Sequence, residues 1–559
     1  MHHRTRKVER NVKRISRWIG RLTCSAAFLS LACLPLNEAF SQSDSTTASV
    51  EAQPTAVDSP ADALSQAVES ITEPKLKRHI DFLASDTLQG REAGMQGNYA
   101  AGAYIVDQLR KSNVSPVATG EDYFHYFHPN FRNILAVIPG SDESLKNEFI
   151  LVGGHYDHVG FGNRTNSRGP FGVVHNGADD NASGTAGVLE IAQSLAQLGT
   201  KPNRSILIAF WDGEEKGLLG SKHFVDYPAI TLSKIRFHLN ADMIGRLRPD
   251  GLEISGWQTA TGCRQFLAQQ NSGGLKLRFM YSYKPESDHW PFFERRVPSL
   301  MLHTGKHADY HRPSDDTHLL NMEGIRQVSQ FMLRYTVAAA NAESLPSFRN
   351  WSAESAETFT QIFKRPPQDE PSRLGVTYDA TLAREGTIRL KSIAAGSPAN
   401  IAGLRTGDEV LAVGNKPTTE SSDFRSLVME APTEATFKIR RDDSEVELPV
   451  TLRGNPVLYG FRWTMHDAEP GSAIVTHVTA DSPGAAAKLK PQHRILKVNG
   501  KKIGTRGEFQ ELLISARGLI RFDVELNGNF EQLTIANETQ SKDEQTATDA
   551  SKAEPLDTK

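Results

Sequence analysis

Two adjacent glutamates, Glu214 and Glu215, follow an apolar run that is typical of a buried strand. The run extends from Ile206 to Trp211, and only Asp212 and Gly213 separate it from the glutamates. Carboxylates beside a buried strand are costly unless a positive group meets them. A bound metal ion is the usual such group, so this segment predicts a fold that brings further metal ligands to the same strand end.

Histidines and carboxylates also stand at or just after the ends of other apolar runs. They are His155-Tyr156-Asp157, Asp179-Asp180, Asp242 and Tyr310-His311. Imidazole combined with carboxylate oxygen is a donor set that suits zinc. Together with the two glutamates, these residues predict a metal centre that performs hydrolytic chemistry.

The chain is long enough for several domains, and its charge is nearly balanced. It has 559 residues and a formal net charge of -3, which gives no reason to expect a nucleic acid partner. Its three cysteines are Cys24, Cys33 and Cys263. An exported chain that had lost its targeting segment would keep only Cys263, which excludes an intrachain disulfide.

Residues 1–41 have the pattern of a signal segment. A basic region containing Arg4 to Arg21 precedes an apolar stretch from Leu22 to Leu36, and Ala39-Phe40-Ser41 is a small-x-small cleavage site. The protein is therefore expected to be exported, to a periplasm or outside the cell. Lipidation at Cys33 and an uncleaved anchor are the alternatives, and only these would attach the chain to a membrane.

The next 300 residues alternate between strand-like and helix-like patterns. A flexible leader is expected at 42–72, followed by an α/β domain at 73–342. Its predicted strands are Asn133–Ile138, Phe149–Gly153, Ile206–Trp211, Phe237–Leu239 and Ser299–His303, and its main helices are Pro74–Ser85, Asn98–Ser112, Gly184–Leu198 and Met322–Ala340. This order predicts a mostly parallel mixed sheet flanked by helices, with ligands at the carboxyl ends of the strands.

The C-terminal third contains an internal repeat. A linker is expected at 343–371, two small β-rich domains at 372–454 and 455–537, and a disordered tail at 538–559. Gly396-Ser397-Pro398-Ala399 in the first repeat corresponds to Asp481-Ser482-Pro483-Gly484 in the second. Each repeat is the size of one small domain.

The ordered set of metal-site motifs resembles the co-catalytic zinc aminopeptidases, a family that includes the bacterial leucine aminopeptidases. The resemblance covers about Pro74 to Ala342 and includes Ser287-Asp288-His289. Any one piece has a plainer explanation: Glu214-Glu215 alone is more often a solvated helix start, and Asp179-Asp180-Asn181 a helix cap. The order of the full set is what carries the resemblance.

The resemblance implies a two-zinc site with defined roles. His155, Asp179 and Asp242 would hold one ion, and Asp179, Glu215 and His311 the other, with Asp179 as the bridge. Glu214 would be the general base, Asp157 would accept the other ring N–H of His155, and Tyr310 would help to polarise the scissile carbonyl. The remaining histidines are expected outside the ligand set, and Asp315 or Asp316 is expected to support His311.

The two repeats resemble bacterial PDZ domains, which bind peptide C-termini. Arg373-Leu374-Gly375-Val376 and Leu458-Tyr459-Gly460-Phe461 match the carboxylate-binding loop. The residues expected to contact a peptide are Leu374, Gly375, Val376, Tyr459, Gly460 and Phe461. The plainer alternative is that one or both repeats only pack on the catalytic domain.

The sequence thus predicts an exported aminopeptidase that acts on peptides or proteins. A carboxypeptidase or glutaminyl cyclase on the same site, and an inactive scaffold that binds through its repeats, are the alternatives. Gln270-Asn271-Ser272-Gly273-Gly274 resembles a serine protease nucleophile loop, but no matching histidine loop precedes it. The segment from Gly245 to Pro285 is expected to contribute to the walls of the substrate pocket.

Overall fold

The computed structural model describes residues 60–117, 122–128, 130–351, 353–364, 373–418, 421–454, 457–479, 482–516 and 518–536. The predicted signal segment, most of the predicted leader and the predicted tail lie outside these residues. All the described helices and strands belong to one compact unit. No helix within the described ranges combines the length and the apolar character needed to cross a membrane.

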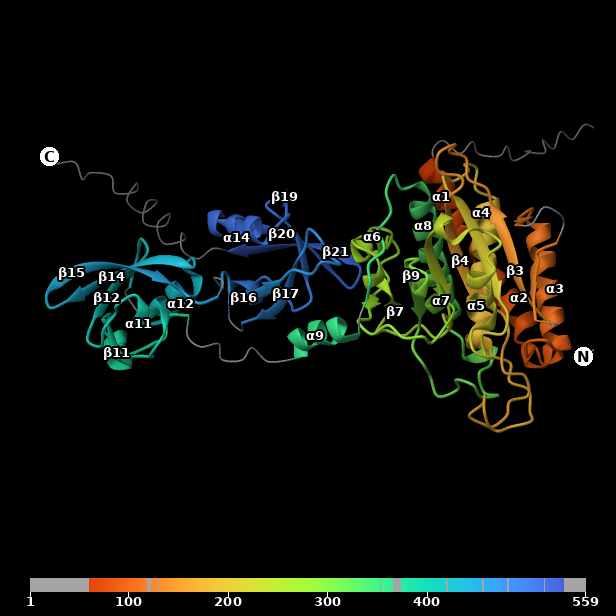
Figure 1. The fold of residues 1–559 in the computed structure, drawn as a ribbon, viewed down its shortest axis with the longest axis horizontal. Helices are drawn as coiled ribbons and strands as arrows, with labels where there is room; N and C mark the ends of the chain where they lie inside the picture. Colours follow the sequence, from red (N-terminus) through yellow and green to blue (C-terminus); the bar gives the residue numbers. More distant parts are fainter. Residues whose placement is uncertain are drawn as a thin grey trace, which may run out of the picture. The chain divides into compact units, whose positions relative to one another are not determined.

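The N-terminal domain is built on a nine-stranded sheet (Figure 1). The strand order is β1-β3-β5-β4-β6-β9-β7-β8, with β2 on β3. The central strands β5, β4, β6 and β9 run parallel, whereas β3 and β7 are antiparallel to their neighbours β5 and β9. The bounds are β1 Ser115–Pro116, β2 Phe124–Phe127, β3 Phe131–Ile138, β4 Phe149–His155, β5 Ser205–Trp211, β6 Ile235–Ala241, β7 Leu252–Ser255, β8 Leu277–Phe279 and β9 Ser299–His303.

Helices cover both faces of this sheet. Alternate residues of a strand point to opposite faces, and in β4 Ile150 and Val152 belong to one core cluster while Leu151 belongs to another. The first cluster packs against α1, α2, α3, α4 and α8, and the second against α5 and α7. The bounds are α1 Pro60–Glu69, α2 Glu73–Leu83, α3 Gln96–Lys111, α4 Gly184–Ala196, α5 Leu219–Asp226, α6 Cys263–Gln269, α7 His289–Glu294 and α8 Met322–Asn341.

Two helices occur where the sequence predicted irregular chain. Helix α1 lies within the predicted leader, and its Ala63, Ala67 and Val68 are buried. Helix α9 (Ala353–Lys364) lies within the predicted linker. Both segments are short and lie beside Pro-rich or polar sequence, so their helical pattern is weak in the sequence alone.

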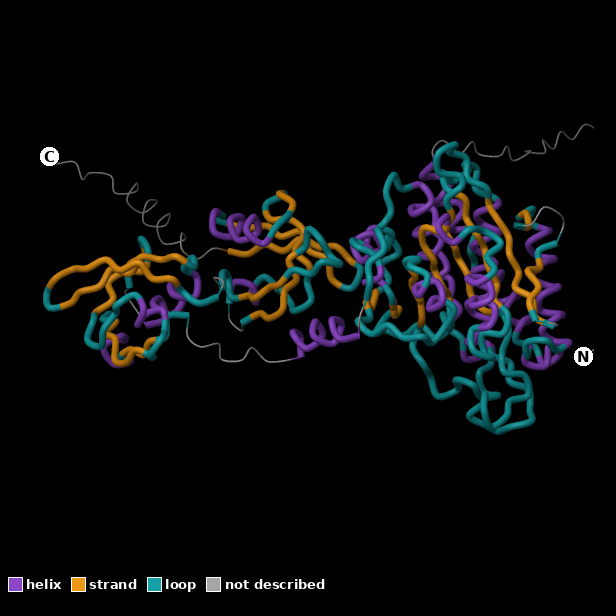
Figure 2. The backbone as a smooth tube through the Cα atoms, viewed as in Figure 1, coloured by secondary structure: helices purple, strands orange, loops and turns teal. Residues whose placement is uncertain are grey.

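The two repeats each form a six-stranded antiparallel sheet with its own core, and both appear as strand-rich units in Figure 2. In the first, the elements are β10 Val376–Tyr378, α10 Ala380–Arg384, β11 Ile388–Ile393, α11 Pro398–Ile401, β12 Glu409–Val413, β13 Lys416–Pro417, α12 Ser421–Glu430, β14 Glu434–Arg441 and β15 Ser444–Thr451. In the second, they are β16 Phe461–Thr464, β17 Ala473–Val478, α13 Pro483–Ala486, β18 Arg494–Val498, β19 Lys501–Lys502, α14 Arg506–Ser515, β20 Leu519–Leu526 and β21 Asn529–Ala536.

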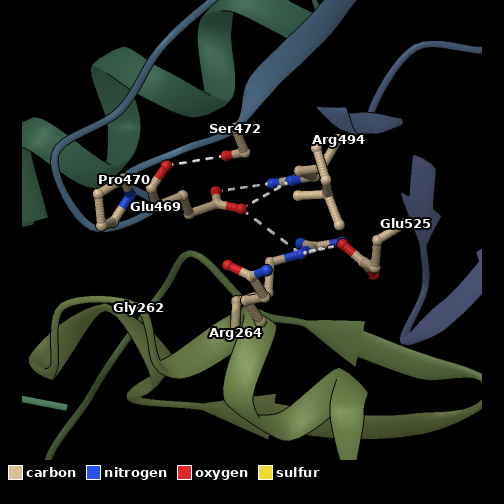
Figure 3. Close-up of a pocket in the computed structure, with 9 residues that line it drawn as sticks. Gly262, Arg264, Glu469, Pro470, Ser472, Arg494 and Glu525 are labelled. Carbon is tan, nitrogen blue, oxygen red and sulfur yellow. Dashed lines mark hydrogen bonds and ion pairs between the residues drawn. The ribbon is translucent and has the colours of Figure 1, made fainter. Parts of the chain in front are cut away.

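The second repeat contacts the N-terminal domain through a buried ionic cluster (Figure 3). Arg264 of α6 lies 2.8 Å from Glu525 and 3.6 Å from Glu469, and Glu469 also pairs with Arg494 at 2.8 Å. All four side chains are at most 4% exposed. Much of the segment from Gly245 to Pro285, expected to line the substrate pocket, thus forms the outer strands of the sheet and the contact with this repeat.

Candidate metal centre

The predicted ligands come from adjacent parallel strands at their carboxyl ends. His155 is the last residue of β4, Glu214 and Glu215 follow β5 on one side of it, and Asp242 follows β6 on the other. His311 lies in the loop that follows β9. The structure therefore gathers at one edge of the sheet four segments that are far apart in the sequence.

Asp180 lies at the centre of these segments. Its Oδ1 is 3.4 Å from Nε2 of His155, which is also 3.6 Å from Oδ1 of Asp242. Its Oδ2 is 3.1 Å from Nε2 of His311, which is in turn 3.1 Å from Oε2 of Glu215. Each oxygen of one carboxylate thus faces a different group of donors, which is the arrangement of a bridging ligand.

Asp179, the residue predicted to be the bridge, does not face the other predicted ligands. Its Oδ1 accepts hydrogen bonds from the Gly245 N–H at 2.6 Å and the Ser183 hydroxyl at 3.0 Å, and its Oδ2 faces His307 at 3.1 Å. The chain enters this turn through Gly177 in the left-handed region (φ 57°), and neighbouring side chains in the turn point in different directions. Two adjacent aspartates cannot be told apart by order alone, because the turn decides which one faces the other ligands.

His158 is a member of the site that the sequence interpretation set aside. Its buried Nδ1 is 3.0 Å from Oε1 of Glu215 and 3.8 Å from Oδ2 of Asp180. With these two carboxylates it forms a second group able to hold a metal ion, beside the group of His155, Asp180 and Asp242. Its position three residues after His155, next to Asp157, was the signal that could have identified it.

Asp157 supports the glutamates more directly than it supports His155. Its carboxylate accepts the backbone N–H groups of Glu214 at 3.0 Å and Glu215 at 3.3 Å. Nδ1 of His155 lies 3.7 Å from that carboxylate and is within hydrogen-bond distance of the Asp157 carbonyl oxygen, at 3.2 Å. The predicted carboxylate–imidazole hydrogen bond is thus replaced by one to the backbone.

The electrostatics of the site divide its carboxylates into two kinds. Burial raises the pKa of Glu214 well above its usual range, and nearby Glu215 adds to this effect. Burial acts in the same direction on Asp180, but His155 and His311 outweigh it and hold the pKa of Asp180 well below its usual range. The Asp180 carboxylate therefore keeps its negative charge more readily, whereas the Glu214 carboxylate binds a proton more readily.

The donors fit a metal ion. Burial would lower the pKa of His311, but the carboxylates of Asp180 and Glu215 outweigh burial and raise it to about 10. Although both carboxylates are close, Nε2 of His311 makes no well-aligned hydrogen bond, and neither does the buried Nε2 of His158. Oxygen and imidazole nitrogen converge here at spacings that a divalent cation would satisfy.

Tyr310 stacks on His311, with 3.9 Å between ring centroids. Arg168 and Lys306 lie over the same tyrosine ring, at 4.9 and 5.0 Å from its centroid. Burial raises the pKa of the Tyr310 hydroxyl above its usual range, so this group remains a proton donor. Its predicted contact with a substrate carbonyl stays a prediction.

The predicted peptide-binding loops of the repeats precede strands at the edges of their sheets. Leu374, Gly375 and Val376 lead into β10, and Tyr459, Gly460 and Phe461 lead into β16. Gly375 and Gly460 have φ values of 80° and 73°, and a Cβ atom at either would lie within 2.2 Å of a serine side chain. Glycine is therefore required at both positions, whereas binding of a peptide stays a prediction.

Comparison with known families matches separate parts of the chain. Residues 133–336 match the model described as Peptidase family M28, and residues 389–441 and 474–525 match the PDZ domain. The first match contains every ligand discussed above. The second and third fall within the two repeats.

Individual relatives match the N-terminal domain. Leupeptin-inactivating enzyme 1 of Streptomyces exfoliatus is 32% identical over 32% of this chain and 36% of its own length, and leucine aminopeptidase 2 of Arthroderma otae is 32% identical over 39% and 44%. The chain thus spans less than half of the length of these relatives. The crystal structure of Legionella pneumophila LapA aminopeptidase has a TM-score of 0.43 at 18% identity, over 51% of this chain and 75% of that chain. The chain carries a peptidase family M28 domain followed by two PDZ domains.

Proposed function

We propose that the protein is an exported aminopeptidase that removes N-terminal residues from peptides with the help of two zinc ions. The observation that carries this proposal is the Asp180 carboxylate, which turns one oxygen toward His155 and Asp242 and the other toward His311 and Glu215. His155, Asp180 and Asp242 would hold one ion, and Asp180, Glu215 and His311 the other. His158 would orient Glu215 through their 3.0 Å contact.

Glu214 is the proposed general base. When bound, paired zinc ions lower the pKa of a water molecule and polarise the substrate carbonyl. Glu214 accepts the proton of the attacking water and passes it to the leaving amine nitrogen. The two N–H groups that Asp157 accepts fix the backbone of both glutamates, so one side chain faces the ligands and its neighbour stays free for proton transfer.

Carboxylates outside the two ligand groups give the site partners for a substrate amino group. Asp157, Glu214 and Asp288 lie around the ligands Asp180, Glu215 and Asp242. The α-ammonium group of a substrate would be attracted to an ionised carboxylate that holds no zinc ion.

Carboxypeptidase activity is the second candidate. Arg168 and Lys306 place two positive charges over Tyr310, beside the ligand His311, and these could pair with a substrate carboxylate. Peptides with a blocked N-terminus distinguish the two activities, because only a carboxypeptidase would cleave them.

The decisive experiment is hydrolysis of aminoacyl p-nitroanilides and short peptides by the mature protein, before and after chelation. We expect cleavage of unblocked substrates that chelation abolishes and zinc restores. Glu214→Gln should lower kcat at least about a hundredfold, the lower range for loss of a general base, with zinc content unchanged. Glu143→Gln, a change at an 87% exposed side chain, is the matched control. Full activity of Glu214→Gln would remove this residue from the mechanism.

Export and peptide recruitment are further parts of the proposal. The basic and apolar pattern of residues 1–41 supports export, which cell fractionation and N-terminal sequencing of the mature protein would test. The loops at Leu374–Val376 and Tyr459–Phe461 support binding of peptide C-termini. A peptide library would be titrated into the wild-type protein and into variants of each loop. The comparison would show whether either repeat binds such ligands.

A further inference from the structure

Asp315 is a buried carboxylate beside the proposed metal centre that belongs to neither group of ligands. Its Oδ2 accepts the backbone N–H groups of Asp179 at 2.9 Å and Asp180 at 3.0 Å. Its own carbonyl oxygen accepts the N–H of Ala178 at 3.1 Å. Three consecutive N–H groups of the segment that carries the bridging carboxylate thus end on this one residue.

The other oxygen of Asp315 contacts a different segment. Oδ1 lies 3.1 Å from Nη2 of Arg246, which follows Asp242 by four residues. Asp315 itself follows His311 by four residues. The side chain therefore connects the segments that carry three proposed ligands, Asp180, Asp242 and His311.

Asp179 forms a second connection between the same segments. Its Oδ1 accepts the N–H of Gly245, just after Asp242, and its Oδ2 faces Nε2 of His307, just before His311. A Cβ atom on Gly245 would lie 2.7 Å from Oδ1 of Asp179, so glycine is needed for this approach. Arg246, whose Nη2 lies 3.1 Å from Oδ1 of Asp315, supplies a positive charge beside this pair of carboxylates.

We propose that Asp315, assisted by Asp179, is a positioning residue for the metal centre and holds the Asp180 carboxylate with one oxygen toward each ion. This inference rests on the metal site proposed above. Groups that hold metal ligands in place without touching the metal typically account for about 10–100-fold in metal affinity. The Asp180 carboxylate serves both ions, so its displacement weakens the pair more than a loss confined to one ion would.

The test is zinc affinity and cobalt(II) absorption of Asp315→Asn in the full chain. Asparagine keeps one acceptor oxygen but loses the charge that faces Arg246. We expect at least one zinc equivalent to bind about tenfold or more weakly in competition with a chelator, with an altered cobalt spectrum and a fall in kcat that exceeds the change in KM. Asp316→Asn is the matched control, because Asp316 caps a short turn by accepting the N–H of Thr317.

A second variant separates positioning from folding. Arg246→Lys keeps the positive charge but not the planar group that reaches both Asp315 and Asp309. If Asp315→Asn does not fold, as judged by circular dichroism, weakened zinc binding in folded Arg246→Lys supports the proposal. Wild-type zinc affinity and an unchanged cobalt spectrum in whichever variant folds would overturn it. A wild-type protein that binds no zinc would instead overturn the proposed function.

Discussion

His238 is an imidazole in the sheet core whose two nitrogens both lack a hydrogen-bond partner among the described residues. It lies on β6, 4.4 Å from the ring of Phe292 and 6.5 Å from that of Trp211 between centroids. Burial lowers the pKa of His238 well below its usual value of 6.5. The folded protein therefore holds this histidine neutral at pH values where an unfolded chain would protonate it.

The sign of the resulting pH dependence follows from that lowered pKa. The contribution of neutral His238 to stability is complete above pH 6.5 and is lost as pH falls below it, because only the unfolded state gains the proton. At pH 5 the loss is at most about 2 kcal/mol. We expect the melting temperature of the wild type to fall more between pH 7 and pH 5 than that of His238→Phe. His318→Phe, at a 72% exposed side chain, should behave as the wild type; equal slopes for wild type and His238→Phe would contradict the prediction.

For single residues, the sequence predicted which residue types form the metal centre, but not which residue takes each position in it. His155, Glu215, Asp242 and His311 were predicted as ligands, and the structure brings them together. Asp180 was not identified, because a turn whose backbone departs from helical angles at Asp180 decides which neighbour faces inward. Such a choice depends on backbone angles that no spacing rule supplies.

Among the elements, the short turn at Asp86–Arg91 ends in a residue that connects several other segments. Arg91 is 1% exposed and donates to the carbonyls of Leu83 at the end of α2, Tyr156 after β4, and Asn176 and Gly177 before Asp180. One guanidinium thus joins a helix end, a strand end and the loop of the site. Burial lowers the pKa of Arg91 to about 10, so it stays charged at neutral pH.

Arg91→Lys should destabilise the N-terminal domain. A lysine has three donors on one nitrogen and cannot reach four carbonyls that a planar guanidinium serves together. Each carbonyl left unpaired costs about 1–3 kcal/mol, so a loss of about 3 kcal/mol is expected in urea denaturation. Arg78→Lys on the exposed side of α2 is the control, and a wild-type urea midpoint for Arg91→Lys would refute the assigned role.

The strands were the most predictable elements. The prediction for Ser299–His303 matches β9, and β4, β5 and β6 extend only a few residues beyond the predicted runs. Continuous apolar stretches mark strands that are buried on both faces. The outer strands β7 and β8 lack that signal, because they are only four and three residues long.

For the whole molecule, the cluster of Arg264, Glu469, Arg494 and Glu525 is expected to couple the unfolding of the second repeat to that of the peptidase domain. Removing one member of a buried ion pair leaves an uncompensated charge and costs about 3–5 kcal/mol. We therefore expect Arg264→Ala to split a shared calorimetric unfolding transition into two.

Arg440→Ala is the control for that experiment. Arg440 pairs with Glu409 on the exposed surface of the first repeat, at 3.1 Å, and such pairs contribute about 0–1 kcal/mol. Increased trypsin cleavage between the peptidase domain and the second repeat in Arg264→Ala alone would support the cooperative unit. Identical calorimetric traces for Arg264→Ala and the wild type would show that this cluster does not couple the unfolding of the two parts.

The outermost strand of the large sheet also gains a neighbour from this contact. β8 ends the sheet, and its Leu277 N–H donates to the carbonyl of Asn527, in the hairpin between β20 and β21, at 2.8 Å. Exposed strand edges are templates on which further chains can add and aggregate. The hairpin of the second repeat thus covers the exposed edge of the large sheet. A chain cut before this repeat is expected to aggregate even though its metal ligands are still in place.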